Sequence, residues 1–182
     1  MNARTRQRGV AALEMALVLP LLLMIALGAF EYGMLFREWL SVTTATREGA
    51  RVAATAGDHS NADCLILEAT AGALKALDTS SIKEVWIYES NEDGHVPPAA
   101  ASQVYRPPKE DDVDLVACET NSWVLEHDGW NPDERDNDGP ERDWVGVRVV
   151  FRHNWVTGFL WWSGEAEFTD DAVLHMEPNY DF

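Results

Sequence analysis

The residues with the clearest chemical potential lie near the N-terminus, where one acid interrupts a long apolar segment. Residues Val10 to Phe30 read VAALEMALVLPLLLMIALGAF, and Glu14 is their only charged residue. A carboxylate inside a membrane segment costs about 2.5–3.5 kcal/mol on insertion scales, so it normally persists because it has a partner. If the chain is cut after Gly9, the new α-amine of Val10 lies one helical turn from Glu14. The carboxylate can then neutralise that amine, or the amine of a neighbouring subunit staggered along a filament.

The apolar segment is long enough to cross a membrane as a helix. It holds about 21 residues, and about 20 are needed to span the hydrocarbon core. Arg4, Arg6 and Arg8 precede it without any acid, which places the short N-terminus in the cytoplasm and the acidic bulk outside. Two other interpretations stay open: a buried helix of a soluble protein, and an ordinary signal peptide cut near Ala26 to Ala29.

The same segment resembles a known class of exported proteins. Arg8-Gly9, then Val10 to Leu13, then Glu14, resembles the class III leader of type IV pilins, which a prepilin peptidase cuts after the glycine on the cytoplasmic side. The continuation ALEMALVLPLLLMIALGAFEYGMLF resembles the TadE-like family of minor pilins, or pseudopilins, of the tight-adherence (Tad, Flp) pilus system. The features that occur in the same order are Pro20, Glu31-Tyr32-Gly33 and Arg47-Glu48-Gly49-Ala50-Arg51.

The resemblance covers about the first fifty residues, with a second and weaker match in AVLHMEP, residues 172 to 178. It implies cleavage between Gly9 and Val10 and an assembly role for Glu14. Met15 departs from the family, which usually has Phe or Tyr there. The implied function is that of a minor pilin in Tad-type pilus assembly or tip formation for surface adhesion. The implied partners are other minor and major pilins, the prepilin peptidase, the assembly platform of the bacterial inner membrane, and the membrane itself.

The alternatives to this function are a permanently anchored assembly or binding factor of the same apparatus, and a secreted binding domain. Catalysis is not expected, because the sequence has no phosphate-binding glycine loop, nucleophile elbow or metal-protease signature. Nucleic acid is not an expected partner either, because the net charge is −17.

The rest of the chain predicts an α+β domain of the type IV pilin plan. Four regions are expected: a leader (1–9), a transmembrane half-helix (10–30), an outer half-helix (31–57) and an acidic globular domain (58–182). The outer half-helix carries an apolar stripe for the domain to pack on, and Gly57-Asp58 ends it. Its stripe residues are Tyr32, Leu35, Phe36, Trp39, Leu40, Val42 and Val52. Pro20 predicts a helix kink.

The globular domain is expected to contain a second helix and three or four antiparallel strands. The helix begins after caps at residues 60–63 and ends near residues 78–80. Strands are predicted at 83–89, 113–118, 144–155 and 165–177, and the stretch 91–108 is predicted to be a surface loop. In the third strand, Val145, Val147, Val149 and Phe151 alternate with more polar positions.

Three further features of this domain suggest binding or bonding. Cys64 and Cys118 can form a disulfide in an oxidising compartment, or remain two buried thiols. An acid-rich loop offers oxygen ligands for calcium, although Val145 stands where an EF-hand needs its last acid and a solvated loop is the alternative. The candidate ligands are Glu134, Asp136, Asp138 and Asp143. The apolar cluster Phe159-Leu160-Trp161-Trp162 contacts a partner if it is exposed, or closes the core if it is buried.

Overall fold

The structure is a computed structural model of the chain. It describes residues 3–74, 77, 79–109, 112, 118, 123–138, 140–158 and 164–178. These residues form two compact units, one made of residues up to 37 with the segment around 154–164, and the other of residues 38–153 with the segment from 165 onward.

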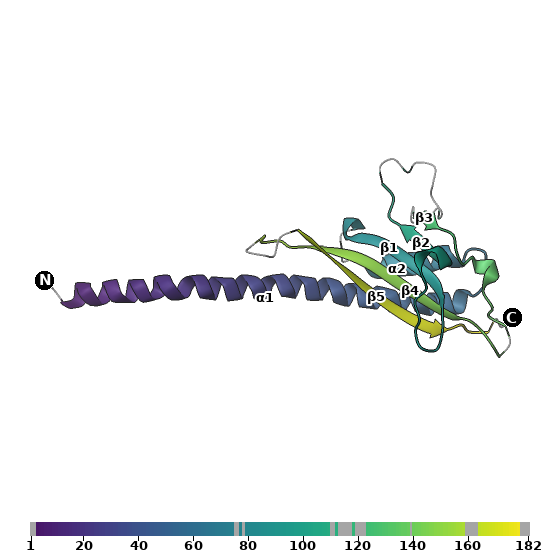
Figure 1. Ribbon diagram of the computed structural model, residues 1–182, viewed down its shortest axis with the longest axis horizontal. Coiled ribbons are helices and arrows are strands. Elements are labelled where there is room, and N and C mark those ends of the chain that lie inside the picture. Colours follow the sequence, from purple (N-terminus) through teal and green to yellow (C-terminus); the bar gives the residue numbers. More distant parts are fainter. Residues whose placement is uncertain are drawn as a thin grey trace. The chain divides into compact units, whose positions relative to one another are not determined.

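Helix α1 (Ala3–Ala56) dominates the N-terminal third of the chain (Figure 1). It is a single helix of 54 residues and continues through Pro20, where a bend stays a prediction. Its end after Ala56 agrees with the predicted stop, because Gly57 takes a positive φ of 57°. A Cβ at this position would lie 2.0 Å from the Asn137 amide nitrogen, so glycine is required for space as well as for φ.

The second unit contains helix α2 and an antiparallel sheet of five strands. The order of the strands across the sheet is β3-β2-β1-β4-β5. Helix α2 covers Ala62–Ala73, and the strands are β1 (Ile82–Ser90), β2 (Ser102–Arg106), β3 (Val124–His127), β4 (Trp144–Asn154) and β5 (Glu165–His175). Three short 3-10 turns, η2 (Thr79–Ser81), η3 (Ala99–Ala101) and η4 (Pro132–Glu134), lie in the connections. The architecture is α+β with a pilin-like layout, as predicted.

The predicted inward positions of β4 are confirmed by their burial, although Gly146 and Val150 at alternate positions are buried as well. Val145, Val147, Val149 and Phe151 all belong to the hydrophobic core. The partner strand β1 contributes Val85 and Ile87, and Val85 lies opposite Val149 in the antiparallel register. The core therefore lies between one face of the sheet and the helices.

Two strands were not predicted, and the predicted loop at 91–108 was wrong in part. Strand β2 lies within that stretch, between Pro97-Pro98 and Pro107-Pro108, and four of its five residues are buried. The prolines flank the strand rather than break it, since they fall outside its hydrogen-bonded ladder. Strand β3 has only four residues, too few to show a period of two. Helix α2 also ends earlier than predicted, at Ala73. Of the strand predicted at 113–118, residues 113–117 lie outside the described part, and Cys118 is not in a strand.

The predicted apolar stripe of α1 is right only in part. Val42 is fully buried and Val52 packs against the core, but Tyr32, Phe36, Trp39 and Leu40 are exposed. From Glu38 onward the buried positions are mostly small, and the fully buried ones are Val42, Ala45, Thr46, Ala50 and Ala53, with Gly49 also buried. Small side chains let the helix axis approach its neighbours closely, so backbone proximity, and not bulk, decides which face is covered.

Polar contacts attach both ends of this half-helix to the sheet region. Near its start, the Glu38 carboxylate lies 2.7 Å from His153 Nδ1 at the end of β4. In the middle, the Thr46 hydroxyl donates to Asp170 of β5 at 2.7 Å. Near its end, the Glu177 N–H donates to the Ala54 carbonyl at 2.8 Å. The strands thus follow α1 from Glu38 to Ala54.

We predict that Gly49→Ala destabilises the domain by about 1–3 kcal/mol, the usual cost of overpacking. An added Cβ would lie 2.4 Å from Thr70 Oγ1 and 3.1 Å from Val147 Cγ1. Thr70 cannot turn away freely, because its hydroxyl donates to the Ile66 carbonyl at 2.8 Å inside the core. Chemical unfolding of the detergent-solubilised protein, followed by tryptophan fluorescence, measures the change.

The matched control for this prediction is Gly72→Ala in α2. Nothing lies within 4 Å of a Cβ built at Gly72, so alanine there should stabilise the helix by up to about 1 kcal/mol. Equal effects of the two substitutions would contradict the close packing at Gly49.

Candidate functional site

The first half of α1 presents an apolar surface that the chain itself does not cover. Ten large apolar side chains between Val10 and Ile25 are exposed, and Leu17 is 73% exposed. The helix is long and apolar enough to cross a membrane, judged by length and composition. An exposed apolar surface of this extent requires lipid or other apolar helices around it.

Glu14 lies on this uncovered surface and is itself exposed. It follows Val10 by four residues within the same helix, so the two positions lie on one face, one turn apart. The geometry permits the predicted pairing of the Glu14 carboxylate with an amine at Val10. Cleavage after Gly9 and this pairing stay predictions.

A second acid, Glu31, directly follows the apolar segment and is fully buried. Its carboxylate accepts hydrogen bonds from the backbone N–H groups of Val156, at 3.1 Å, and Thr157. Next to it, the rings of Tyr32 and Trp155 meet edge to face with centroids 6.1 Å apart. Charge-assisted bonds of this kind are about twice as strong as neutral ones. Glu31 therefore fixes the connection after β4 onto α1.

Only an indirect signal in the sequence pointed to this role of Glu31. Its place in the Glu31-Tyr32-Gly33 motif was noted, but its partners come from a segment 125 and 126 residues further along the chain. A lone acid at the end of an apolar run normally indicates the membrane surface. Its burial follows from the fold of the β4–β5 connection, which sequence periodicity does not reveal.

The motif Glu48-Gly49-Ala50-Arg51 has two residues that face solvent and two that are buried. Glu48 and Arg51 form an exposed ion pair at 2.5 Å, and the hydrogen bond from Arg51 lowers the pKa of Glu48. Exposed pairs contribute little to stability because water screens them. Gly49 and Ala50 are buried against the domain. Close packing therefore explains the two small residues of this motif.

A buried polar cluster joins α2 to β2 and to the acid-rich loop. The Arg135 guanidinium donates to the Asp63 carboxylate, and the Tyr105 hydroxyl donates to the same carboxylate at 2.7 Å. Arg135 also lies over the Trp130 ring, with 4.8 Å from Cζ to the centroid. Because Asp63 has two donors, the cost of burying its charge is largely offset.

The disulfide between Cys64 and Cys118 is present beside this cluster, with 5.5 Å between the Cα atoms. It closes a separation of 54 residues, which contributes about 4 kcal/mol in the chain-entropy treatment. Cys64 directly follows Asp63, so the covalent link and the ion pair hold the same turn of α2.

Three of the four candidate calcium ligands accept hydrogen bonds from backbone N–H groups. Glu134 accepts the Asn131 N–H at 2.9 Å, and Asp136 accepts the Asp138 N–H at 2.9 Å. Asp143 accepts the Asp136 N–H at 2.7 Å. Within the described part of the chain, no group of His, Cys, Asp or Glu side chains is arranged to hold a metal ion. Calcium binding by these acids stays a prediction.

The predicted contact cluster Phe159-Leu160-Trp161-Trp162 lies outside the described residues. Its role stays a prediction.

A long apolar N-terminal helix whose second half packs against an antiparallel sheet defines the pilin-like class of proteins. Residues 9–51 match the family model described as TadE-like protein, which confirms the resemblance seen in the sequence. This match indicates involvement in the Tad pilus system. No curated protein and no solved structure matches the chain.

We predict that Glu31→Gln loosens the connection after β4. A neutral amide has one acceptor oxygen in place of two, so one of the two N–H groups loses its partner, at about 1–3 kcal/mol. Amide hydrogen exchange at Val156 and Thr157 should become about tenfold faster. Glu48→Gln, which removes a charge from the exposed face of the same helix, should leave these amides unchanged. Unaltered amide exchange in Glu31→Gln would rule out the proposed role of Glu31 in holding the segment after β4.

We also predict an alkaline limit to stability that depends on Tyr105. Burial, followed by the Asp63 charge and hydrogen bond, raises the pKa of Tyr105 above its ordinary 10.0. The fold therefore favours the neutral phenol, so this stability is complete below pH 10 and is lost as the pH rises above it. Tyr105→Phe should cost about 1 kcal/mol at pH 7.

The measurement is the free energy of unfolding between pH 9 and 12. Its decline with pH should be shallower in Tyr105→Phe. Burial also raises the pKa of Tyr88 to about 12, so adding Tyr88→Phe should flatten the decline further. An identical decline in the wild type and both variants would contradict the assignment.

Proposed function

We propose that the protein is a minor pilin or pseudopilin of a Tad-type pilus, cut by a prepilin peptidase between Gly9 and Val10. The observation that carries this proposal is the match of residues 9–51 to the TadE-like family on a helix whose apolar half is uncovered. Before assembly, lipid covers this half as a single membrane span. In the pilus, the corresponding half-helices of neighbouring subunits take the place of lipid.

Glu14 supplies the electrostatic step of assembly in this proposal. In the membrane, its carboxylate neutralises the α-amine that cleavage creates on Val10. In the fibre, it meets the amine of a neighbouring subunit, which fixes the axial register because a misplaced charge in an apolar environment costs several kcal/mol. The pairing thus stabilises one axial stagger of neighbouring helices relative to all others.

The outer domain suits a rare position in the fibre, at the tip or base. It extends from residue 58 and carries 27 of the 31 acids of the chain. Repeated on every subunit, such a domain would crowd the fibre and repel its copies. A minor subunit involved in initiation or tip formation avoids both problems. No catalytic role is proposed.

We predict that Glu14→Ala retains leader removal but abolishes piliation. The peptidase site at Gly9 is unchanged, whereas the amine of Val10 loses its partner inside the apolar bundle. Processing is measured by the mass of the mature N-terminus, and piliation by counting sheared fibres. Gly9→Val should instead block processing itself.

The matched control is Glu48→Ala, which removes an exposed acid from the outer half of the same helix. Cells with this variant should form pili normally. Normal fibres in Glu14→Ala would contradict the pairing. A mature N-terminus at Val10 supports both the pilin and a permanently anchored factor, and recovery in sheared pili selects the pilin. A start near Phe30 would contradict both, leaving a secreted domain.

A further inference from the structure

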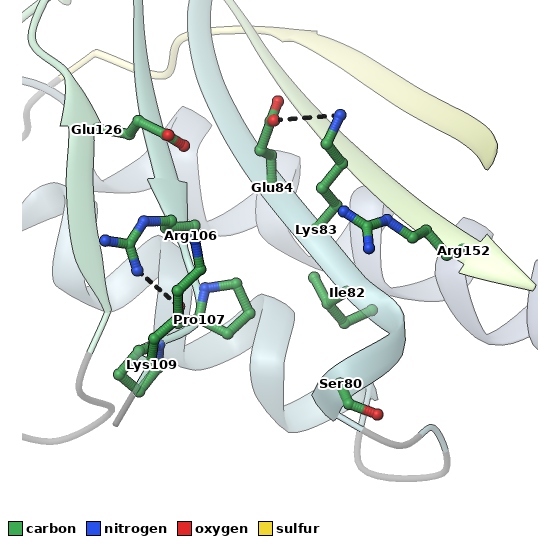
Figure 2. Close-up of a pocket in the computed structure, with 10 residues that line it drawn as sticks. Ser80, Ile82, Lys83, Glu84, Arg106, Pro107, Lys109, Glu126 and Arg152 are labelled. Carbon is green, nitrogen blue, oxygen red and sulfur yellow. Dashed lines mark hydrogen bonds and ion pairs between the residues drawn. The ribbon is translucent and has the colours of Figure 1, made fainter. Parts of the chain in front are cut away.

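A pocket of about 270 Å³ lies at one end of the sheet, where β1 begins and β2 and β4 end (Figure 2). Its charged lining consists of Lys83, Arg106, Lys109 and Arg152 with Glu84 and Glu126. Ile82 and Pro107 form apolar parts of the wall. The volume is several times that of a water molecule, about 30 Å³, and close to the lower limit of small-ligand sites.

The concentration of positive charge here is unusual for this chain. Residues 58–182 contain eight Lys and Arg residues and 27 Asp and Glu residues. Four of those eight cations line the pocket, against two of the 27 acids. A local excess of cations within a strongly acidic domain is an anion-attracting feature, because field lines concentrate in hollows.

One cation of the pocket is held rigidly in place. Asp112 accepts two bonds from the Arg106 guanidinium, at 2.5 and 2.9 Å. Asp112 is well covered, and the bond from Arg106 holds the pKa of its carboxyl far below the ordinary value. This pair fixes the pocket wall and keeps Arg106 at its position.

The other three cations are more available. Lys83 bonds Glu167 at 3.2 Å and Arg152 approaches Glu165 at 3.6 Å, and in both pairs the side chains are about one-third to one-half exposed. Such pairs are worth little and are readily exchanged for a better anion. Within the described part of the chain, Lys109 has no ion pair.

The two acids of the lining differ in their engagement. Glu84 accepts the Trp86 indole N–H at 2.8 Å and lies 3.6 Å from Lys83, so its negative charge is already partly balanced by these two partners. Glu126 is exposed and opposes an anion. Figure 2 shows both glutamates on the same side of the hollow, away from Lys109. Asp112 already occupies the Arg106 guanidinium, so the ammonium group of Lys109, unpaired among the described residues, is the part of the lining most favourable for a further negative charge.

We propose that this pocket binds a phosphate group, either as a soluble phosphate compound or as the phosphate of a lipid head group. A phosphate monoester carries about −1.5 to −2 charge at pH 7 and three acceptor oxygens, so it can engage cations from several segments at once. A carboxylate has only one charge and two oxygens. Ile82 and Pro107 provide apolar contact for the group that carries the phosphate.

The test uses full-length protein in a neutral detergent, titrated with inorganic phosphate at constant ionic strength. The indole N–H resonance of Trp86 is the reporter, assigned with Trp86→Phe, because its acceptor Glu84 lines the pocket. We expect a saturable shift with phosphate and none with chloride. Lys109→Gln combined with Arg152→Gln should weaken binding at least fivefold, and Glu126→Gln should strengthen it.

The matched control is Arg51→Gln, which removes one positive charge from an exposed pair on α1 and should leave phosphate affinity unchanged. Equal shifts with phosphate, acetate and chloride, or equal affinities in all variants, would overturn the proposal. These results do not depend on cleavage or piliation, so they are separable from the proposed pilin function.

A second experiment distinguishes the two sources of phosphate. The protein is placed in nanodiscs of phosphatidylcholine, with or without phosphatidic acid. A Trp86 shift produced by phosphatidic acid, and lost in the lysine and arginine variant, supports the lipid as the source. A shift only on addition of free phosphate supports a soluble ligand. No response to either phosphate would contradict the site.

Discussion

The structure depends on one constraint: a single helix must satisfy two different environments. The half of α1 from Val10 to Phe30 is apolar apart from Glu14 and is mostly exposed, whereas the half from Glu38 onward contributes to the core of a folded domain. A membrane segment must satisfy its backbone hydrogen bonds internally, which a helix does.

The two halves solve their packing by different means. The outer half uses small residues, because Gly49, Ala50 and Ala53 let α2 and β4 approach its backbone. The apolar half uses large aliphatic side chains, which gain from lipid or from other helices. The change occurs around Glu31, where a buried carboxylate bonds the segment after β4. Before this acid, the side chains of α1 need lipid or other helices to cover them. After it, the cover comes from other segments of the same chain.

Much of this arrangement could be predicted from the sequence. The long helix could be predicted from its apolar run, and its end from Gly57. Local patterns of period 3.6 or 2 predicted helix α2 and the strands β1, β4 and β5. Strands β2 and β3 have four or five residues each and gain their stability from pairing with β1 and with each other. Their existence depends on contacts that no local pattern records.

The same distinction applies to the candidate sites. Gly9, Val10 and Glu14 could be proposed from the sequence because their chemistry depends on spacing along one helix, and their roles stay predictions. The partners of Glu31, Asp63 and the four cations of the pocket come from distant segments, so spacing does not bring them together. The acid loop was also chosen by spacing, and the structure adds what spacing does not show: its carboxylates accept bonds from nearby backbone N–H groups, while calcium binding stays a prediction.

The family match covers only part of the chain, so it separates the features shared with the family from those that lie outside the match. It covers residues 9–51, which include the proposed cleavage site, Glu14, Glu31 and the close-packed Gly49, and it ends within α1. In the proposed function, these residues serve membrane entry, charge pairing and attachment of the domain. The sheet, the disulfide and the cationic pocket all lie beyond this range. Under the proposed function, the helix therefore serves assembly, and recognition outside the cell falls to the domain that it carries.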